Sequence, residues 1–480
     1  MRESDALTWR MEADPVLRST IVSVAWLDGA PDWDRLLERL DRATRSASSF
    51  RMVVVEPPAR LATPRWVPAP AFDLSWHLRR VDAPEPRTAA TVVDMARTAA
   101  MTAFDPARPL WEFTVVGNLV GGRAALVMKV HHALTDGVGG MELAPLLFDM
   151  DAAAGSIDAM PADRAGEPSG ERVGGLGLVR ESLAHQAGRV LRTARNAAAA
   201  APAAAVRAAR HPAGAAGDVI ATAASIGRTV APVTTALSPV MTARSLGRRL
   251  DMMTVPLAGL KAAAAGRGTV NAAYLTAVTG GLARYHEAHG APVGELRVTL
   301  PISIRTPDDP IGGNRITLQR FRLPAGTGRT AERLSAVGRR AEAVRRERSL
   351  PHTDAIAGGL NVLPAGVVGE ILKHVDFVAS NVPAFPWPVH LAGARVAALH
   401  AWGPTIGAAL NVTLVSYAGT CWVGLNTDTA AVADPETLAA CLADGFEEVL
   451  ALGGDHDPVV RPLAEGRFPG EPAKQRRRTT

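Results

Sequence analysis

Lysine and aromatic residues are scarce in this chain of 480 residues. Lysine stands only at positions 129, 261, 373 and 474, and aromatic residues make up 5% of the chain, so arginine supplies most of the positive charge. The formal net charge of +5 is modest for this length. A nucleic-acid-binding protein gathers basic residues in a stripe interleaved with aromatic side chains that stack on bases. The composition therefore disfavours a nucleic-acid partner.

Cysteine is nearly absent, since only Cys421 and Cys441 occur. Two cysteines are too few for a disulfide framework, and their spacing is not that of a zinc or redox motif. We therefore expect a protein of a reducing compartment, without structural disulfides and without a metal site.

Signals for export and for membrane insertion are also lacking. The first 15 residues carry charges throughout and contain no apolar run, which disfavours a secretory signal. Residues 396–427 contain no Asp, Glu, Lys or Arg, but Trp402-Gly403-Pro404 interrupts any helix there, and residues 410–416 alternate as a strand does. We expect a buried β-hairpin in this stretch and a cytoplasmic protein.

Apolar residues, in contrast, are plentiful at 47%, so the chain can bury a large core. Its length suggests more than one domain at about 150 residues each. Helix and strand patterns alternate before residue 150 and resume after residue 250. The predicted units are an N-terminal domain at 1–150, a helical connector rich in Ala and Arg at 151–250, a C-terminal domain at 251–460 and a basic tail at 461–480.

The connector has two interpretations that the sequence leaves open. Between 171 and 250, arginine far outnumbers acidic residues, with apolar residues at many of the other positions. The first interpretation is a linker with two or three solvated helices. The second is a basic amphipathic surface that rests on anionic lipid headgroups.

Periodicity predicts the elements of both domains. Apolar residues at helical spacing indicate helices at 33–46, 141–148, 271–288, 330–348 and 435–452. Short apolar runs indicate strands at 52–55, 112–116, 123–130, 296–304, 316–323 and 375–379.

The motif that carries chemistry is His131-His132-Ala133-Leu134-Thr135-Asp136-Gly137. It follows a predicted strand and precedes an apolar helix. A histidine can take a proton near neutral pH, and a carboxylate four or five residues on can orient a ring nitrogen or hold the loop. Two buried histidines satisfied by carbonyl groups are the structural alternative. A metal site would need a third ligand, and spacing identifies none.

This motif matches the active-site motif of the coenzyme-A-dependent acyltransferase superfamily. Elsewhere the chain resembles the bacterial wax ester synthase/diacylglycerol acyltransferase family, and the resemblance runs from near residue 30 to near residue 455. The segments that carry it are Pro64-Arg65-Trp66, Phe72-Asp73-Leu74 with His77, Pro109-Leu110-Trp111, Gly313-Asn314-Arg315, Ser380-Asn381-Val382-Pro383 and Leu391-Ala392-Gly393-Ala394.

The resemblance implies two chloramphenicol-acetyltransferase-like α/β sandwich domains joined by the connector, with the active site in a tunnel between them. It implies that His132 is the general base, that His131 supports it, and that Asp136 fixes the loop. Gly137 would allow a backbone conformation closed to larger residues. Acyl-CoA would be a co-substrate, and no resident cofactor is implied.

Further candidates surround this motif. Pro109-Leu110-Trp111 is either a turn with a core tryptophan or a wall of the acyl channel. Ser380 and Asn381 belong to a strand end whose polar groups would face the tunnel. An oxyanion donor is required for the tetrahedral intermediate, and Asn271 and Ser380 are the candidates.

One position departs from the family pattern. Family members commonly carry Asn-Asp at the start of the first helix after the connector, whereas this chain has Asn271-Ala272. If the missing carboxylate only caps the helix, Asn271 can replace it. If it orders the active site, turnover or acceptor choice would change.

The resemblance implies an enzyme that transfers a long-chain acyl group from acyl-CoA to diacylglycerol or a fatty alcohol. Peripheral attachment to the inner membrane or to lipid droplets is the corresponding partner hypothesis. The alternatives are a lipid-binding member that is not catalytic or uses another acceptor, a glycerol-phosphate-type acyltransferase, and a condensation enzyme that works with a carrier protein.

Overall fold

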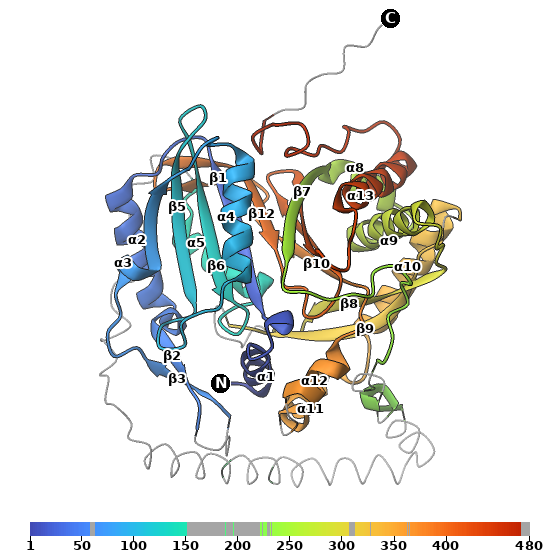
Figure 1. The fold of residues 1–480 in the computed structure, drawn as a ribbon, viewed down its shortest axis with the longest axis horizontal. Helices are drawn as coiled ribbons and strands as arrows, with labels where there is room; N and C mark the ends of the chain where they lie inside the picture. The colour runs from blue at the N-terminus through green and yellow to red at the C-terminus, as the bar shows by residue number, and fades with distance from the viewer. Residues whose placement is uncertain are drawn as a thin grey trace, which may run out of the picture.

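Two mixed sheets organise the protein (Figure 1). The computed structural model describes residues 1–57, 63–150, 188, 195, 221–222, 224–227, 231, 233–306, 313–326, 328–361, 363 and 365–471. The first sheet has the order β11 (His390–Leu391), β12 (Ala394–Trp402), β1 (Thr20–Leu27), β6 (Arg123–His131), β5 (Trp111–Leu119) and β4 (Leu78–Asp82). The second has the order β7 (Arg248–Pro256), β14 (Thr420–Asp428), β13 (Leu410–Tyr417), β10 (Phe377–Pro383), β8 (Glu295–Ser303) and β9 (Ile316–Pro324).

Helices cover the faces of both sheets, and α2 lies beside α5. The N-terminal half contains α1 (Glu3–Met11), α2 (Trp33–Ser46), α3 (Leu74–His77), α4 (Ala89–Met101) and α5 (Gly137–Leu147), the short helices η1 (Pro15–Leu17) and η2 (Ser48–Arg51), and a ribbon of β2 (Met52–Val55) and β3 (Arg65–Pro68). The C-terminal half contains α8 (Leu257–Ala264), α9 (Val270–Ala288), α10 (Thr330–Arg345), α11 (Thr353–Leu360), α12 (Ala365–Leu372) and α13 (Pro435–Leu450), with η5 (Leu350–His352) and η6 (Ala451–Gly453).

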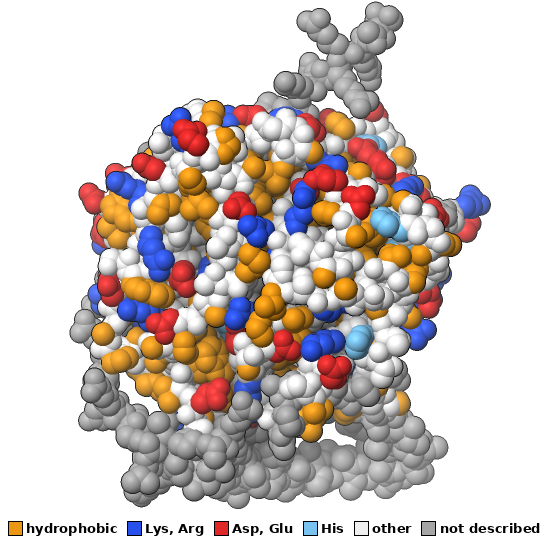
Figure 2. Space-filling model, viewed as in Figure 1, with side chains coloured by type: hydrophobic (Ala, Val, Ile, Leu, Met, Phe, Trp, Pro, Cys, Tyr) orange, Lys and Arg blue, Asp and Glu red, His pale blue; other side chains and the backbone are white. Residues whose placement is uncertain are grey.

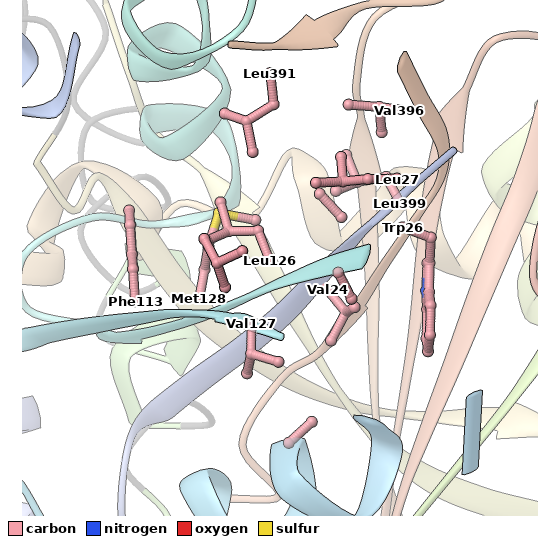
Figure 3. Packing of buried hydrophobic residues seen from close by; sticks show 14 of the residues in the cluster. Val24, Trp26, Leu27, Phe113, Leu126, Val127, Met128, Leu391, Val396 and Leu399 are labelled. Atoms are coloured by element: carbon pink, nitrogen blue, oxygen red, sulfur yellow. The ribbon is translucent and has the colours of Figure 1, made fainter. Parts of the chain in front are cut away.

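The chain crosses between the halves at β11 and β12. Both strands come late in the sequence, yet β12 pairs with β1 and completes the first sheet. Figure 3 shows side chains of both strands in one apolar cluster, in which Leu27 of β1 lies near Val396 of β12. The indole Nε1 of Trp26 donates to Nδ1 of His400 at 3.1 Å. Burial lowers the pKa of His400 to about 3, so this ring stays neutral and its Nδ1 accepts.

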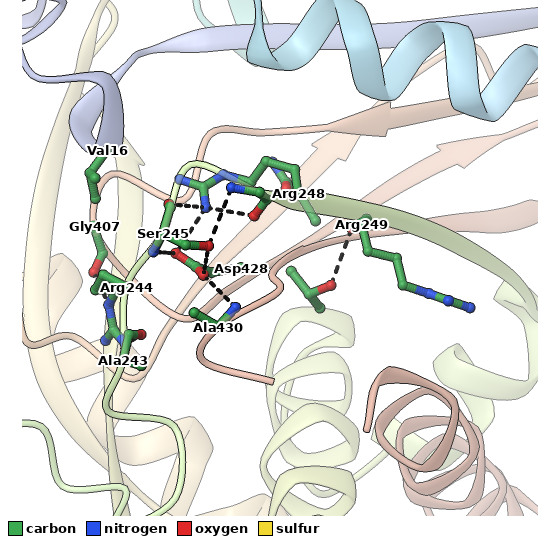
Figure 4. A network of polar contacts seen from close by, with 12 residues as sticks. Val16, Ala243, Arg244, Ser245, Arg248, Arg249, Gly407, Asp428 and Ala430 are labelled. Atoms are coloured by element: carbon green, nitrogen blue, oxygen red, sulfur yellow. Dashed lines mark hydrogen bonds and ion pairs between the residues drawn. The ribbon is translucent and has the colours of Figure 1, made fainter. Parts of the chain in front are cut away.

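A buried carboxylate anchors the segment that enters the second sheet (Figure 4). Asp428 accepts hydrogen bonds from the backbone N–H and the hydroxyl of Ser245, both at 2.7 Å, and from Nη1 of Arg248 at 2.9 Å. Burial alone would raise the pKa of Asp428, but the bonds from Ser245 and the charge of Arg248 lower it. The carboxylate is therefore ionised and holds residues 245–248 against the end of β14.

Most predicted elements are confirmed. The helix at 33–46 and the strand at 52–55 have the predicted bounds, and the helix at 271–288 becomes α9. α10 ends at Arg345 and α13 at Leu450, earlier than predicted, because short η helices and turns follow them. The apolar stretch at 396–427 contains the predicted hairpin, β13 and β14, although its first residues belong to β12 of the other sheet.

The structure describes only part of the residues on which the predictions for the connector, the basic tail and the domain boundaries depend. Most of the connector and the last nine residues of the basic tail lie outside the described residues. The division at residues 150, 250 and 460 therefore stays a prediction.

Within the described part of the chain, no helix is long and apolar enough to cross a bilayer. On the face shown in Figure 2, basic and acidic side chains alternate over both halves.

Helix α1 joins the two halves. Arg2 and Ser4 both donate to the Asp354 carboxylate of α11, at 2.8 and 3.1 Å. Asp5 accepts from Nδ2 of Asn314 at 3.1 Å. The first helix of the chain is thus fixed on residues more than 300 positions away.

Asp5 predicts a pH dependence of stability. Burial raises its pKa to about 7, although the charge of Arg2 opposes this shift. The folded protein therefore binds this proton more tightly than the unfolded chain, and its unfolding free energy falls as pH rises from about 4 to about 7. At about 1.4 kcal/mol per pKa unit, the loss is about 4 kcal/mol.

The substitution Asp5→Asn should remove this part of the dependence, because an amide oxygen still accepts from Asn314 but does not ionise. Urea unfolding of both proteins at pH 5 and pH 8 measures the difference. We expect the variant to gain stability relative to the wild type on going to pH 8. The same pH slope in both proteins would contradict the assignment to Asp5.

Candidate active site

His132 lies at the end of β6, where the two halves meet. Its backbone N–H donates to the carbonyl of Ser19 at 2.9 Å. Its side chain is half-buried. Burial lowers the pKa of His132 below the usual 6.5, and this effect exceeds the opposing influence of the Asp136 charge. The imidazole is consequently neutral at neutral pH, as a general base must be.

Two cavities share His132. The larger, cavity 1, has a volume of about 430 Å³ and runs between α2, α5, the inner face of the first sheet and the ends of β8, β10 and β13. Its walls are mainly apolar and include Leu40, Phe113, Met128, Leu143, Leu147 and Phe148. The smaller, cavity 2, has a volume of about 120 Å³ and lies between α1, α11 and β9. His132 and Ile316 line both, so a side chain able to move a proton stands where the two cavities meet.

His131 is held by a carboxylate that sequence analysis missed. It is fully buried, and its Nδ1 accepts from the N–H of Ala133 at 3.0 Å. The proton therefore resides on Nε2, which lies 3.1 Å from Oε1 of Glu12. Burial would raise the pKa of Glu12, but the contact with His131 and the hydrogen bond from the N–H of Ser19 lower it. Glu12 is thus ionised and fixes the ring orientation of His131.

Each carboxylate oxygen of Asp136 accepts a hydrogen bond from a backbone N–H. Its Oδ1 accepts from the N–H of Gly139 at 2.7 Å and caps α5. Its Oδ2 accepts from the N–H of Arg315 at 2.5 Å and lies 3.8 Å from Arg305. With 1% of its surface exposed, it ties the motif loop to the C-terminal half.

The glycines of the motif provide room rather than an unusual backbone. The prediction that Gly137 adopts a backbone conformation closed to larger residues is wrong, because Gly137 is the first helical residue of α5. A Cβ atom there would stand 2.7 Å from Cγ2 of Val382. At Gly139 a Cβ would stand 2.5 Å from the carbonyl oxygen of Gly313. Close approach of the two halves therefore requires small residues at both positions.

Three predicted polar residues come together in cavity 1. Asn271, Ser380 and Asn381 all line it, as does His132. Nδ2 of Asn381 donates to Oδ1 of Asn271 at 3.3 Å. This bond occupies the oxygen of Asn271, so Nδ2 is the end of that amide that can donate to a ligand.

Pro109, Leu110 and Trp111 lie one layer behind the cavity wall. The carbonyl of Leu110 accepts from the N–H of His131 at 3.0 Å. Trp111 stacks on His77 at 4.5 Å, and its Nε1 donates to the carbonyl of Phe50 at 2.8 Å. Phe50 lines cavity 1. The segment therefore supports both the histidine pair and a lining residue.

The position that departs from the family pattern does not face a cavity. Thr269 caps α9 by accepting from the N–H of Ala272 at 3.1 Å, so the expectation that Asn271 replaces the cap is wrong. Ala272 has 1% of its surface exposed and packs near Gly268 and Gly338. An acidic residue at this third helical position would reach back to the cap, as in a capping box.

The substitution Ala272→Asp should therefore leave the choice of acceptor unchanged. A carboxylate there can bond the backbone N–H of Thr269, and it lies outside the walls of both cavities. Rates with an alcohol and with a diacylglycerol acceptor, compared for variant and wild type, measure this. A changed ratio of the two rates would show that the position orders the active site.

Glu12, Asn314 and Arg305 were not identified as site residues from the sequence. Glu12 is one of several charges in the first 15 residues, and no local pattern links it to His131. Asn314 belongs to a segment of the family resemblance but carried no assigned role. Among the described residues, no three His, Cys, Asp or Glu side chains gather as a possible metal site.

Sequence comparisons match this chain to models of one protein family. Residues 1–274 match the model of the wax ester synthase/diacylglycerol acyltransferase catalytic domain, and residues 312–449 match that of the corresponding C-terminal domain. A Mycobacterium tuberculosis H37Rv protein named "Putative diacyglycerol O-acyltransferase" is 37% identical over 468 residues, which cover 96% of this chain and 93% of that protein.

Solved structures confirm the predicted fold class. The wax ester synthase/diacylglycerol acyltransferase from Marinobacter aquaeolei VT8 superimposes with a TM-score of 0.61 at 20% identity, covering 94% of this chain and 98% of that chain. The first condensation domain of the calcium-dependent antibiotic synthetase gives a TM-score of 0.62 at 16% identity, covering 96% and 97%. At these identities the likeness concerns the fold alone.

Proposed function

Since the chain belongs to the wax ester synthase/diacylglycerol acyltransferase family, we propose that it transfers a long-chain acyl group from acyl-CoA to diacylglycerol or a fatty alcohol. The products are triacylglycerol or a wax ester. The observation that carries the proposal is the position of His132 between two cavities of unequal size. Two substrates that enter separately can meet at one neutral imidazole.

In this proposal His132 removes the proton from the acceptor hydroxyl while the oxygen attacks the thioester carbonyl carbon. A new C–O bond forms and a tetrahedral intermediate results. Its collapse breaks the C–S bond, and the protonated His132 returns the proton to the departing CoA thiolate. No acyl-enzyme forms, because the acceptor oxygen itself is the nucleophile.

The tetrahedral intermediate carries a negative oxygen that needs a donor. Nδ2 of Asn271 is the candidate supported by geometry, because Asn381 occupies the oxygen of that amide. Ser380 lines the same wall. His131 and Asp136 act as positioning residues, His131 by support of the neighbouring ring and Asp136 by closure of the motif loop.

Cavity 1 suits the acyl chain because its long walls are mainly aliphatic and aromatic. Acyl-CoA is a co-substrate here, and the proposal includes no resident cofactor. Attachment to a membrane or lipid droplet surface remains part of the proposal, since the lipid acceptors reside there. The connector that would mediate it lies largely outside the described residues.

Thiol release from palmitoyl-CoA by the purified protein tests the function. Hexadecanol and a diacylglycerol serve as acceptors, and the lipid products are identified by mass. We expect release that depends on an acceptor and yields the matching ester. Folded protein that releases no thiol with either acceptor would favour the alternative, a lipid-binding member that is not catalytic or uses another acceptor.

A further inference from the structure

A third cavity, cavity 3, lies between the two halves and has a volume of about 170 Å³. The N-terminal half contributes Arg18, Thr20 and Met101 to its walls, and the C-terminal half contributes Arg248 and Asn426. No aspartate or glutamate is among the described residues that line it. Two guanidinium groups in a wall without a carboxylate form a candidate site for an anion.

Both arginines are held in place, and each keeps an unused donor. Nη1 of Arg18 donates to the carbonyl of Met101 at 2.8 Å. Nη1 of Arg248 donates to Oδ2 of Asp428 at 2.9 Å and to the carbonyl of Ser245 at 3.0 Å (Figure 4). The Nη2 atom of each guanidinium has no hydrogen-bond partner among the described residues, and neither Nη2 is sealed from solvent. Each side chain can therefore donate to an oxygen in the cavity.

The carboxylates that balance these two charges stand outside the cavity wall. Asp428 is fully buried beside Arg248. Oε2 of Glu12 lies 4.0 Å from Nε of Arg18. Neither carboxylate lines cavity 3. An anion in the cavity would therefore meet the guanidinium groups at shorter range than the carboxylates, and the net interaction is attractive.

Cavity 3 adjoins the cavity in which acyl transfer is proposed. Pro404 lines both cavity 1 and cavity 3. Thr20 of cavity 3 lies opposite His131 in the pairing of β1 with β6, one residue from the base His132. A donor whose thioester reacts in cavity 1 can thus extend its other end past Pro404 toward the two arginines. In acyl-CoA that end carries phosphate groups, which the fork of an arginine binds well.

We propose that Arg18 and Arg248, one from each half of the protein, bind the phosphate groups of the acyl-CoA donor in cavity 3. This inference rests on the proposed acyl transfer and assigns the part of the site that holds the nucleotide end of the donor. Both arginines act in binding and not in the chemical step. Their removal should therefore raise KM for a phosphorylated donor and leave a donor without phosphates unaffected.

Two donors with the same reactive group test the inference in the wild-type protein. They are palmitoyl-CoA and palmitoyl-pantetheine, assayed by thiol release with hexadecan-1-ol as acceptor. The thioester and the pantetheine arm are the same, but only palmitoyl-CoA carries phosphates. We expect kcat/KM for palmitoyl-CoA to be at least about tenfold higher, the value of one hydrogen bond to a charged group.

Arg18→Gln locates the effect. A glutamine amide can still donate to the carbonyl of Met101 but has no charge. We expect KM for palmitoyl-CoA to rise by about tenfold, with the kinetics of palmitoyl-pantetheine unchanged. Because Arg18 lies near Glu12, a merely structural role would slow both donors equally. An equal loss with both donors would therefore overturn the inference.

Two further variants guard against loss of folding. Arg248→Lys keeps a positive charge beside Asp428 but removes the Nη2 donor, and it should also weaken palmitoyl-CoA selectively. Arg97→Gln is the matched control, because Arg97 is a partly exposed arginine of α4 that lines none of the three cavities. It should keep the wild-type ratio of the two donors.

Calorimetry separates this inference from the proposed function, because it needs no turnover. CoA and inorganic phosphate are titrated into the wild type and Arg18→Gln. We expect CoA to bind the variant about tenfold more weakly. Equal CoA affinity in the two proteins would overturn the inference, as would a site that takes inorganic phosphate but not CoA. CoA binding that depends on Arg18, in protein that releases no thiol with any acceptor, would count against the proposed function alone.

Discussion

Replacing His132 by alanine is expected to lower the turnover of palmitoyl-CoA with an alcohol acceptor by about 10²- to 10⁴-fold. The reason is that no other described side chain lines both cavities and can take a proton. The loss should fall on kcat, because the walls that bind the acyl chain are unchanged. Steady-state thiol release at saturating acceptor measures it.

His289→Ala is the matched control, because His289 is exposed at the far end of α9 and lines neither cavity. It should turn over as the wild type does. Circular dichroism and thermal unfolding establish that both variants are folded. A folded His132→Ala protein with wild-type kcat would exclude general-base catalysis by this residue.

The pH profile gives a second readout for His132. Because burial lowers its pKa, the base stays deprotonated at a pH where an ordinary histidine is half protonated. We expect kcat/KM to decline only below pH 6.5 as the pH falls. Recording the profile in Asp5→Asn separates this step from Asp5, whose pKa lies near 7. A decline centred above pH 6.5 in that background would contradict a buried neutral base.

Sequence patterns predicted those helices and strands that are determined by residues close together in the chain. The helix α2 has leucines at helical spacing and an Asp32 side chain that accepts from the N–H of Arg35, so both its face and its start could be inferred from neighbouring residues. The hairpin of β13 and β14 could likewise be inferred from alternation and a turn. The two-sandwich architecture came from the family resemblance, because periodicity does not specify which strands pair.

The contacts that build the site join residues far apart in the sequence. β12 pairs with β1, and the partner of His131 is Glu12, more than 100 residues earlier in the chain. Nothing in the residues around Glu12 marks it, because its role depends on where η1 and β1 carry the chain next. The same holds for Asn314, whose amide meets α1 only through the packing of the two halves.

Replacing Glu12 by alanine is expected to reduce kcat by about 10- to 100-fold, because it removes the group that fixes the histidine pair. The N–H of Ser19 loses its acceptor, and Nε2 of His131 loses the carboxylate oxygen that lies 3.1 Å away. Since the carbonyl of Ser19 accepts from the N–H of His132, the disturbance passes to the base itself. The buried N–H of Ser19 left unpaired should also lower the unfolding free energy by about 1–3 kcal/mol.

The variant Glu12→Gln distinguishes positioning from simple loss of stability. An amide oxygen can still accept from His131, so we expect it to recover much of kcat, with KM unchanged in both variants. Glu38→Ala, which removes an exposed carboxylate on α2, is the control for charge loss. Rates must be expressed per folded molecule, from urea unfolding of each variant. If folded Glu12→Ala has the wild-type kcat, Glu12 only stabilises the fold, and the orientation of His131 does not limit the reaction.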